Sequence, residues 1–240
     1  MRLITYIILL TIIFGCKKPS ERSCWKSNGE VSHINKVITT TNKITVLDNL
    51  NLILINDSLN EIIIEGPKNL IKLIELDQKN HQITIKNNNK CNFLRKNMDI
   101  NIHYHYKQLD SLILKGYGNV SNNGEMNHSI FINAKDALCS INLKLNNDSN
   151  KIIIQNGSTD INLSGHCSYF YFYNEGFGPL KAFELEAKKT HIHSNSISNS
   201  EINVTEQLNA EIRNNGNIYY KGTPTIIQTT NSGNGRLIPQ

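Results

Sequence analysis

Two short segments carry histidines one residue apart, His103 with His105 and His191 with His193. Residues i and i+2 of a β-strand point to the same face, so either pair could chelate a transition-metal ion through its imidazole nitrogens. Neither pair has a third histidine or a carboxylate at a fixed local spacing. The pattern therefore favours solvent-facing strand histidines, and we predict no metal site.

An aromatic run lies between these two segments, where tyrosine and phenylalanine alternate over five residues. Alternation along a strand places Phe170 and Phe172 on one face and the three tyrosines on the other, and either set could pack inward. Exposed tyrosines would suit contact with a carbohydrate or a peptide, and a surface ladder of aromatic side chains is the alternative. The candidate surface-binding residues are Tyr169, Tyr171 and Tyr173.

Motifs of catalysis are missing from the sequence. It contains no Gly-x-Ser-x-Gly elbow, no His-Glu-x-x-His pair and no phosphate-binding glycine loop. Acidic residues of the kind that polysaccharide-cleaving enzymes use occur in turn-like segments, at Asp136, Asp148, Asp160 and Glu175. We therefore predict a non-catalytic protein without a cofactor. A polysaccharide-active enzyme is the alternative.

The N-terminus has the features of an export signal. Arg2 precedes an apolar run from Leu3 to Phe14, which has the length of a signal-peptide core and is shorter than the roughly 20 residues of a membrane-spanning helix. A glycine and Cys16 follow at once, an order that resembles the bacterial lipobox. There the cysteine thiol is linked to diacylglycerol, and a further acyl chain on the freed amine makes the anchor stable.

We therefore predict a signal peptide over residues 1–15, lipidation of Cys16 and a lipid-anchored tether over residues 16–35. An ordinary secretory signal or an uncleaved anchor is the alternative. A lipid anchor places the protein in the cell envelope. Because no aspartate follows Cys16, we expect the outer membrane, facing either the surface or the periplasm.

Four cysteines remain after Cys16, an even number that an oxidising compartment could pair in three ways. A bridge between Cys24 and Cys91 would join the N-terminal segment to the first half of the chain. Cys139 and Cys167 each lie beside a strand-like run, and they could pair or remain buried thiols. The spacing of these cysteines does not match a zinc site.

The body of the chain predicts strands and turns throughout. Short runs of β-branched and aromatic residues, such as Lys43–Leu47 and Lys151–Ile154, alternate with clusters of Asn, Asp, Gly and Ser. The 3.6-residue period of a helix is missing from longer windows, and only residues 70–76 could form a helical turn.

An internal repeat refines this prediction. The tripeptide Ile-Asn-Leu occurs at residues 141–143 and 161–163, with related tripeptides at 100–102 and 202–204. On a strand the two aliphatic side chains face one way and the asparagine the other, and stacked asparagines can form hydrogen-bonded ladders. The spacing fits a unit of about 20 residues, which predicts a β-solenoid of stacked coils. A β-sandwich is the alternative.

Composition supports an uncharged β-rich surface. Asparagine and isoleucine are the most frequent residue types, and charged residues make up 19% of the chain. The formal net charge of +5 is too small and too dispersed to indicate a nucleic-acid partner. We expect two abutting halves, an N-terminal β half over residues 36–130 and a C-terminal β-solenoid half over residues 131–240.

Several segments, in their order, resemble the head GIN domain family of bacterial surface lipoproteins, whose members are described as autotransporter adhesins. They include Leu112–Val120 and Gly157–Gly165, and the further ranges are 24–29, 88–92, 176–182, 215–224 and 232–237. The resemblance covers about residues 24–240. It implies a right-handed parallel β-helix-like fold, export and an adhesive role.

Together these observations predict a lipoprotein that presents a β-solenoid surface for adhesion, or for binding a glycan or protein ligand, at the cell envelope. A polysaccharide-active β-helix enzyme and a structural envelope component without a diffusible ligand are the alternatives. The expected partners are the membrane, through the lipid anchor, and a glycan or a protein.

Overall fold

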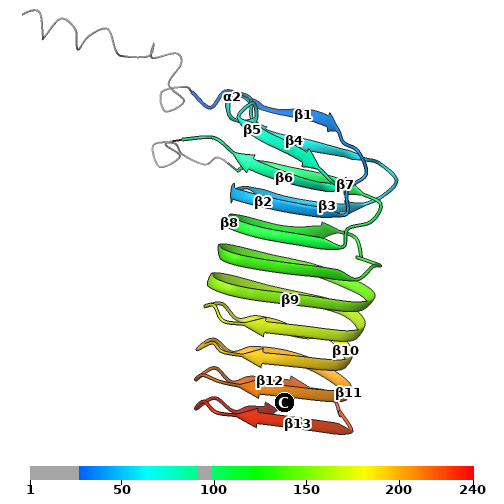
Figure 1. The fold of residues 1–240 in the computed structure, drawn as a ribbon, viewed down its shortest axis with the longest axis vertical. Coiled ribbons are helices and arrows are strands. Elements are labelled where there is room, and N and C mark those ends of the chain that lie inside the picture. Colours follow the sequence, from blue (N-terminus) through cyan, green and yellow to red (C-terminus); the bar gives the residue numbers. More distant parts are fainter. Residues whose placement is uncertain (1–26, 91–98) are drawn as a thin grey trace, which may run out of the picture.

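A computed structural model describes residues 27–90 and 99–240, and the fold of these residues is all-β (Figure 1). One short helix, α2 (Lys68–Ile71), accompanies the strands in the described part of the chain. The strands are β1 (Val31–Val37), β2 (Lys43–Asn49), β3 (Asn51–Asn56), β4 (Glu61–Pro67), β5 (Ile74–Lys79), β6 (Gln82–Asn87), β7 (Asn101–Tyr106), β8 (Ser111–Asn123), β9 (Ile130–Asn174), β10 (Leu180–Ser194), β11 (Ser200–Ile212), β12 (Ile218–Lys221), β13 (Ile226–Asn231) and β14 (Leu237–Pro239).

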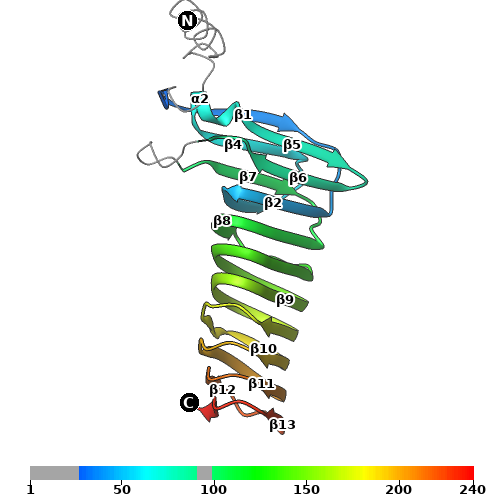
Figure 2. The same cartoon turned by 60° about the vertical axis from the view of Figure 1, so that its left-hand side comes forward.

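From β8 to the C-terminus the ribbon winds down the molecule in successive layers (Figures 1 and 2). Neighbouring layers pair in parallel, so that Leu180 of β10 lies between Ile161 of β9 and Ser200 of β11. The side chain of Asn162 donates a hydrogen bond to Asn142, 20 residues earlier. The repeat seen in the sequence is therefore the residue offset between adjacent layers in this part of the chain.

Each layer contributes one strand segment to each of two faces of the molecule, and each face carries one candidate binding surface. The first face contains Ser111–Leu114 of β8 and Phe131–Ala134 of β9, and it continues through Lys189–Ser194 of β10 to β13. The second face contains the ends of β8 and the starts of β10 and β11, and it continues to β12 and β14.

The N-terminal strands are arranged differently. β1 pairs antiparallel with β4, β4 antiparallel with β7, and β5 antiparallel with β6. β2 lies in parallel between β6 and β8, and β3 lies in parallel between β7 and β8. The tripeptide at 100–102 is thus separated from the β8 layer by β3, an earlier piece of chain, and the 20-residue offset does not extend to it.

Alternation along the strands builds the core. Ile141, Leu143, Ile161 and Leu163 point inward and are at most 3% exposed, whereas Asn142 is exposed, as the tripeptide pattern predicts. Burying an aliphatic side chain of this size contributes about 1.5–3 kcal/mol relative to leaving it exposed. The stacking of such pairs in every layer is therefore the main stabilising term of the fold.

Glycines allow the layers to approach at the corners. Gly165 has φ +106°, and a Cβ there would lie 1.9 Å from the carbonyl oxygen of Leu145 in the preceding layer. Only glycine avoids both the left-handed backbone strain and this clash.

The predicted helical turn at 70–76 is realised only at its start, because α2 ends at Ile71 and β5 begins at Ile74. Signal peptide 1–15, Cys16, Cys24 and Cys91 lie outside the described residues, as does the first part of tether 16–35. The division into an N-terminal β half (36–130) and a C-terminal β-solenoid half (131–240) stays a prediction. No helix among the described residues is long and apolar enough to cross a membrane.

Candidate binding surfaces

The aromatic run of β9 lies on the first face with its tyrosines outward. Phe170 and Phe172 are buried, and their rings stack in the core with centroids 6.1 Å apart. Tyr169 is 38% exposed, and Tyr171 and Tyr173 are half-buried at the surface. The strand thus places all three candidate tyrosines on one solvent-facing line.

The next layer sets histidines beside these tyrosines. Parallel register pairs Tyr171 with His191 and Tyr173 with His193. Ring centroids lie 5.5 Å apart for Tyr171 and His191 and 4.4 Å apart for the two histidines. On the other side Lys151 Nζ lies 5.1 Å from the centroid of the Tyr171 ring. We call these six residues the Tyr–His stripe, which consists of Lys151, Tyr169, Tyr171, Tyr173, His191 and His193.

An acidic partner in the following layer fixes one end of the stripe. Glu211 contacts Nδ1 of His193 and accepts a hydrogen bond of 2.8 Å from Nε of Arg213. This Arg213 contact lowers the pKa of the Glu211 carboxyl. Partial burial lowers the pKa of His191, and the neighbouring His193 lowers it further. His191 is therefore mainly neutral at pH 7 and offers one donor and one acceptor.

The other histidine pair has structural partners. His103 Nε2 lies 2.9 Å from Glu65, and His105 Nδ1 lies 2.7 Å from Asp57. Each imidazole thus joins β7 to a carboxylate of its own. In residues 27–90 and 99–240, no group of three or more His, Cys, Asp or Glu is arranged to hold a metal ion.

Cys139 and Cys167 carry free thiols in the structure. Burial raises the pKa of Cys167 to about 11 and also raises the pKa of Cys139. Both thiols therefore stay protonated at neutral pH, which makes them unreactive packing residues.

A hollow on the second face is a surface that the sequence patterns did not predict. It has a volume of about 590 Å³ and crosses the layers from β8 to β12. We call it the Phe183 groove. Its lining comprises Ser121, Asn122, Asn142, Leu143, Lys144, Asn162, Leu163, Ser164, Lys181, Phe183, Glu184, Glu201 and Lys221.

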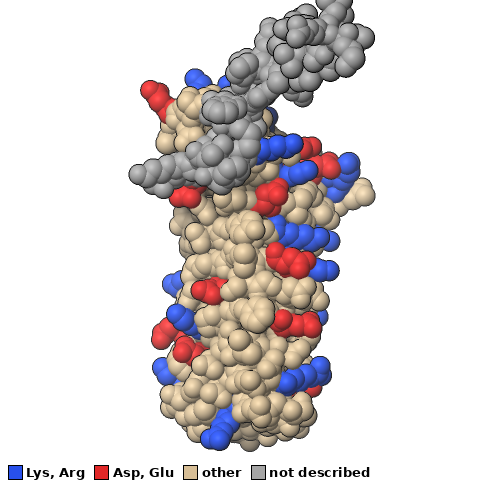
Figure 3. Space-filling view, turned by 90° about the vertical axis from the view of Figure 1, so that its left-hand side faces the viewer, with Lys and Arg blue, Asp and Glu red and all other residues tan. Residues whose placement is uncertain are grey.

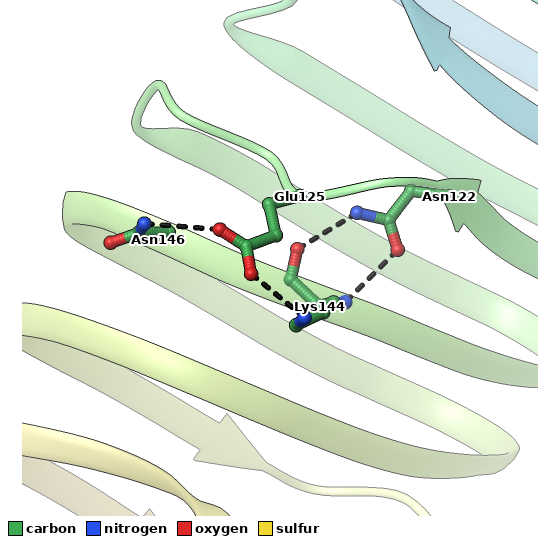
Figure 4. A network of polar contacts seen from close by, with 4 residues as sticks. All are labelled: Asn122, Glu125, Lys144 and Asn146. Atoms are coloured by element: carbon green, nitrogen blue, oxygen red, sulfur yellow. Dashed lines mark hydrogen bonds and ion pairs between the residues drawn. The ribbon is translucent and has the colours of Figure 1, made fainter.

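A polar network includes two lining residues of the Phe183 groove, Asn122 and Lys144 (Figure 4). Asn122 and Lys144 exchange two hydrogen bonds, from the Asn122 amide to the Lys144 carbonyl and from the Lys144 backbone N–H to Asn122 Oδ1. Lys144 Nζ reaches Glu125 at 2.8 Å, and the Asn146 amide donates to the same carboxylate. The charge of Lys144 is thus neutralised within the protein.

Comparisons with known proteins identify the relatives of this fold. A family model described as "Putative auto-transporter adhesin, head GIN domain" matches residues 41–224. The chain belongs to this family. The head GIN family match thus includes β2 to β12 and both surfaces described above. A comparison with curated proteins found no match.

Solved structures share the head GIN fold. A crystal structure titled as a putative adhesin from Bacteroides fragilis is 21% identical, with a TM-score of 0.78, covering 88% of this chain and 97% of that chain. One from Parabacteroides merdae with the same description is 20% identical, with a TM-score of 0.62 and coverages of 88% and 96%. A Parabacteroides distasonis structure titled as a putative lipid binding protein is 20% identical, with a TM-score of 0.54 and coverages of 87% and 97%.

Proposed function

We propose that the protein is an exported, lipid-anchored and non-catalytic binding protein of the cell envelope. In this proposal the Tyr–His stripe contacts a glycan or protein ligand and thereby mediates adhesion. The observation that carries the proposal is the alignment of three outward tyrosines with two histidines of the adjacent layer. Adhesin titles among the structural relatives agree with this role.

The stacked layers make the stripe a rigid platform. Tyr171 and His191 are neighbours in a continuous parallel ladder, so that their backbone positions are fixed before a ligand arrives. Tyrosine offers a large amphipathic contact area at a low cost in side-chain entropy. A pre-organised row of such side chains therefore keeps more of its interaction energy as affinity.

The finer fold class is part of the proposal. The parallel pairing of successive layers and the 20-residue hydrogen-bond offsets support a parallel β-solenoid. Its right-handed winding is inferred from the resemblance to the head GIN family. A solenoid exposes long, regular faces, and such faces are used by repeat proteins as binding surfaces.

A binding array tests the stripe directly. Purified protein would be applied to immobilised glycans and extracellular-matrix proteins, alongside the variant Tyr171→Ala. We expect the variant to lose about tenfold or more in affinity for at least one glycan or matrix protein that the wild type retains. The matched control is Tyr117→Ala, because Tyr117 is 58% exposed and lies outside the stripe. Equal binding by both variants would refute the assignment of the stripe.

Membrane anchoring is tested separately through Cys16. Metabolic labelling with palmitate should mark the wild-type protein and not Cys16→Ala, and the variant should leave the membrane fraction. Continued membrane association of Cys16→Ala would refute the lipid anchor and leave the stripe untouched.

A further inference from the structure

The Phe183 groove depends on an irregularity in β10. Lys181 of β10 pairs with Asn162 of β9, but the next pair is Glu184 with Ser164, so two residues of β10 face one of β9. On the other side, pairing with β11 stops at Ala182 and resumes at Glu186. Phe183 therefore has no ladder partner in either neighbouring layer.

This bulge turns Phe183 toward solvent. The inward–outward alternation is broken, because Phe183 is half-buried and Glu184 exposed in succession, between the buried Ala182 and Leu185. The carbonyl that the bulge frees accepts a hydrogen bond from the Asn203 amide at 3.2 Å. Bulges often occur beside functional sites because they redirect a side chain. Here the redirected side chain is Phe183, the one aromatic side chain among the lining residues of the groove.

A lysine covers the exposed ring. Lys221 Nζ lies 4.4 Å from the centroid of Phe183. Lys221 is exposed and makes no ion pair with any residue of the described ranges. A cation over a ring at an exposed site contributes only about 0.5–1 kcal/mol. A ligand with a flat, weakly polar face can therefore displace the ammonium group from the ring.

The charges of the groove balance. Within residues 27–90 and 99–240, Lys181, Lys221, Glu184 and Glu201 all lack ion-pair partners, two of each sign. Lys144 is neutralised by Glu125. Acidic and basic side chains also lie next to one another down the stack on the side that Figure 3 shows. This balance does not favour a strongly charged ligand.

Two asparagine amides line the groove in adjacent layers. Asn162 donates to Asn142 at 2.8 Å, and Asn142 donates to Ser140 at 3.0 Å. Ser121 pairs with Asn142 and Lys181 pairs with Asn162, so the layers on either side place a hydroxyl and an ammonium group at the equivalent positions. Each amide keeps one N–H and carbonyl lone pairs beyond these hydrogen bonds. Uncharged and charged polar groups thus follow one another in successive layers, about 4.8 Å apart, which suits a ligand that presents hydroxyls along its length.

We propose that the Phe183 groove binds an uncharged linear polysaccharide that lies along the stack, with one sugar ring on Phe183 and its hydroxyls on the polar side chains of Ser121, Asn142, Asn162 and Lys181. A strand-like peptide fits less well. Outside the bulge at Phe183, the strands that line the groove pair with neighbouring layers on both sides, so the groove offers no continuous free sheet edge for strand addition. The proposal does not depend on the Tyr–His stripe, which lies on the other face.

The test uses the full mature protein on an array of uncharged linear glucans, xylans and mannans, with polygalacturonate as the charged comparator. Phe183→Leu keeps apolar volume and removes the ring, whereas Phe183→Tyr keeps the ring. We expect Phe183→Leu to lose about tenfold in affinity for the retained polysaccharide and Phe183→Tyr to bind within about twofold of the wild type.

Matched controls separate this site from others. Phe177→Leu removes a phenylalanine that is 59% exposed and lies outside the groove, and Tyr171→Ala disrupts the Tyr–His stripe. Both should bind the polysaccharide like the wild type. Thermal unfolding of each variant shows whether the fold is kept. If Phe183→Leu fails to fold, Lys181→Met replaces it as the groove variant, because Lys181 is exposed, and this variant should also weaken binding.

Four results would overturn the proposal. One is retention of none of the uncharged polysaccharides by the wild type. Another is equal binding by the Phe183→Leu and Phe177→Leu variants. The third is a preference for polygalacturonate that disappears in salt, which would indicate an electrostatic anion surface. The fourth is loss of binding in Tyr171→Ala alone, which would support the stripe and refute the groove.

Discussion

Strands β1–β7 at the N-terminal end pair out of sequence order and partly antiparallel, whereas β8–β14 pair in parallel with strands of the adjacent layer. At the N-terminal end, β1, β4, β5 and α2 cover the stack. At the other end, β13 pairs with β11 and with no other described strand, and all six of its residues are exposed. We call β1–β7 and α2 the cap, because they end the sheet, and β8–β14 the repeating region.

Both candidate binding surfaces lie in the repeating region. A repeating layer places equivalent side chains one above another, and both the Tyr–His stripe and the Phe183 groove use this alignment. In the cap, polar side chains instead hold strands together, as His103 of β7 does with Glu65 of β4. Substitutions in the cap and in the repeating region should therefore differ in their effects.

The close contact between layers at Gly165 should not tolerate an added Cβ. Gly165→Ala places its Cβ 1.9 Å from the Leu145 carbonyl oxygen, whereas Gly66→Ala in the cap places it 3.1 Å from the Asp99 carbonyl oxygen. We expect Gly165→Ala to lower the free energy of unfolding by about 3 kcal/mol or more, and Gly66→Ala by clearly less. Urea titration measures both. Gly124→Ala, with nothing within 4 Å of its Cβ, reports the backbone strain alone.

Core aromatic residues should differ between the regions in their need for a hydroxyl. The Tyr104 hydroxyl in the cap lies 2.5 Å from Thr41 Oγ1, and burial raises its pKa. Phe170 and Phe172 fill the core of the repeating layers. Tyr104→Phe should therefore cost about 1–2 kcal/mol, because it leaves Thr41 unpaired, and Phe170→Tyr should cost about as much through an unsatisfied buried hydroxyl. A stabilising Phe170→Tyr in thermal melts would contradict this reading.

Asparagine ladders should matter more in the cap than in the stack. Asn51 donates to Asn101 at 3.1 Å and accepts from the backbone N–H of Asn119 at 3.0 Å, so it joins three strands. Asn162 only donates to Asn142 within β9. We expect Asn51→Ala to cost about 1 kcal/mol and Asn162→Ala about half as much. The same urea titration measures both, and a reversed order would break the distinction.

A small pH effect should arise where the two regions meet. His128 follows β8, and its ring packs edge-on against Tyr106 of β7 with centroids 5.4 Å apart. Burial lowers the pKa of His128, while Asp110 raises it by a smaller amount. Below a pH of about 6.5, the unfolded chain binds a proton that the folded protein resists, so stability falls as pH falls.

This pH effect is measured as the difference between wild type and His128→Asn. The difference in unfolding free energy between pH 8 and pH 5.5, values chosen to bracket the ordinary histidine pKa of about 6.5, should be smaller in the variant. An unchanged difference would show that His128 does not contribute. The remaining histidines are common to both proteins and cancel in the comparison.

The sequence predicts the repeating region well, since its determinants are local. Ile141-Asn142-Leu143 alternates in and out as a strand requires, and its copy 20 residues later is its neighbour in the next layer. Alternation alone leaves two possibilities for the aromatic run, with either the tyrosines or the phenylalanines facing the core. The structure decides between them, because Phe170 stacks on Phe172 in the core and the tyrosines face outward.

The sequence did not predict the cap or the groove. The insertion of β3 between β7 and β8 depends on contacts between distant segments, and no spacing in the chain encodes it. The Phe183 groove exists only where several layers stack around a bulge. Its one local signal is the loss of alternation from Ala182 to Leu185, which is visible in the sequence but has no meaning until the layers are in place.

Protease shaving of intact cells tests the adhesive role most directly, because a ligand outside the cell can be reached only from the outer surface. The account predicts that protease added to intact cells digests the protein and abolishes attachment of those cells to the ligand that the array identifies. A protein that survives on intact cells and is digested only after lysis would contradict the account.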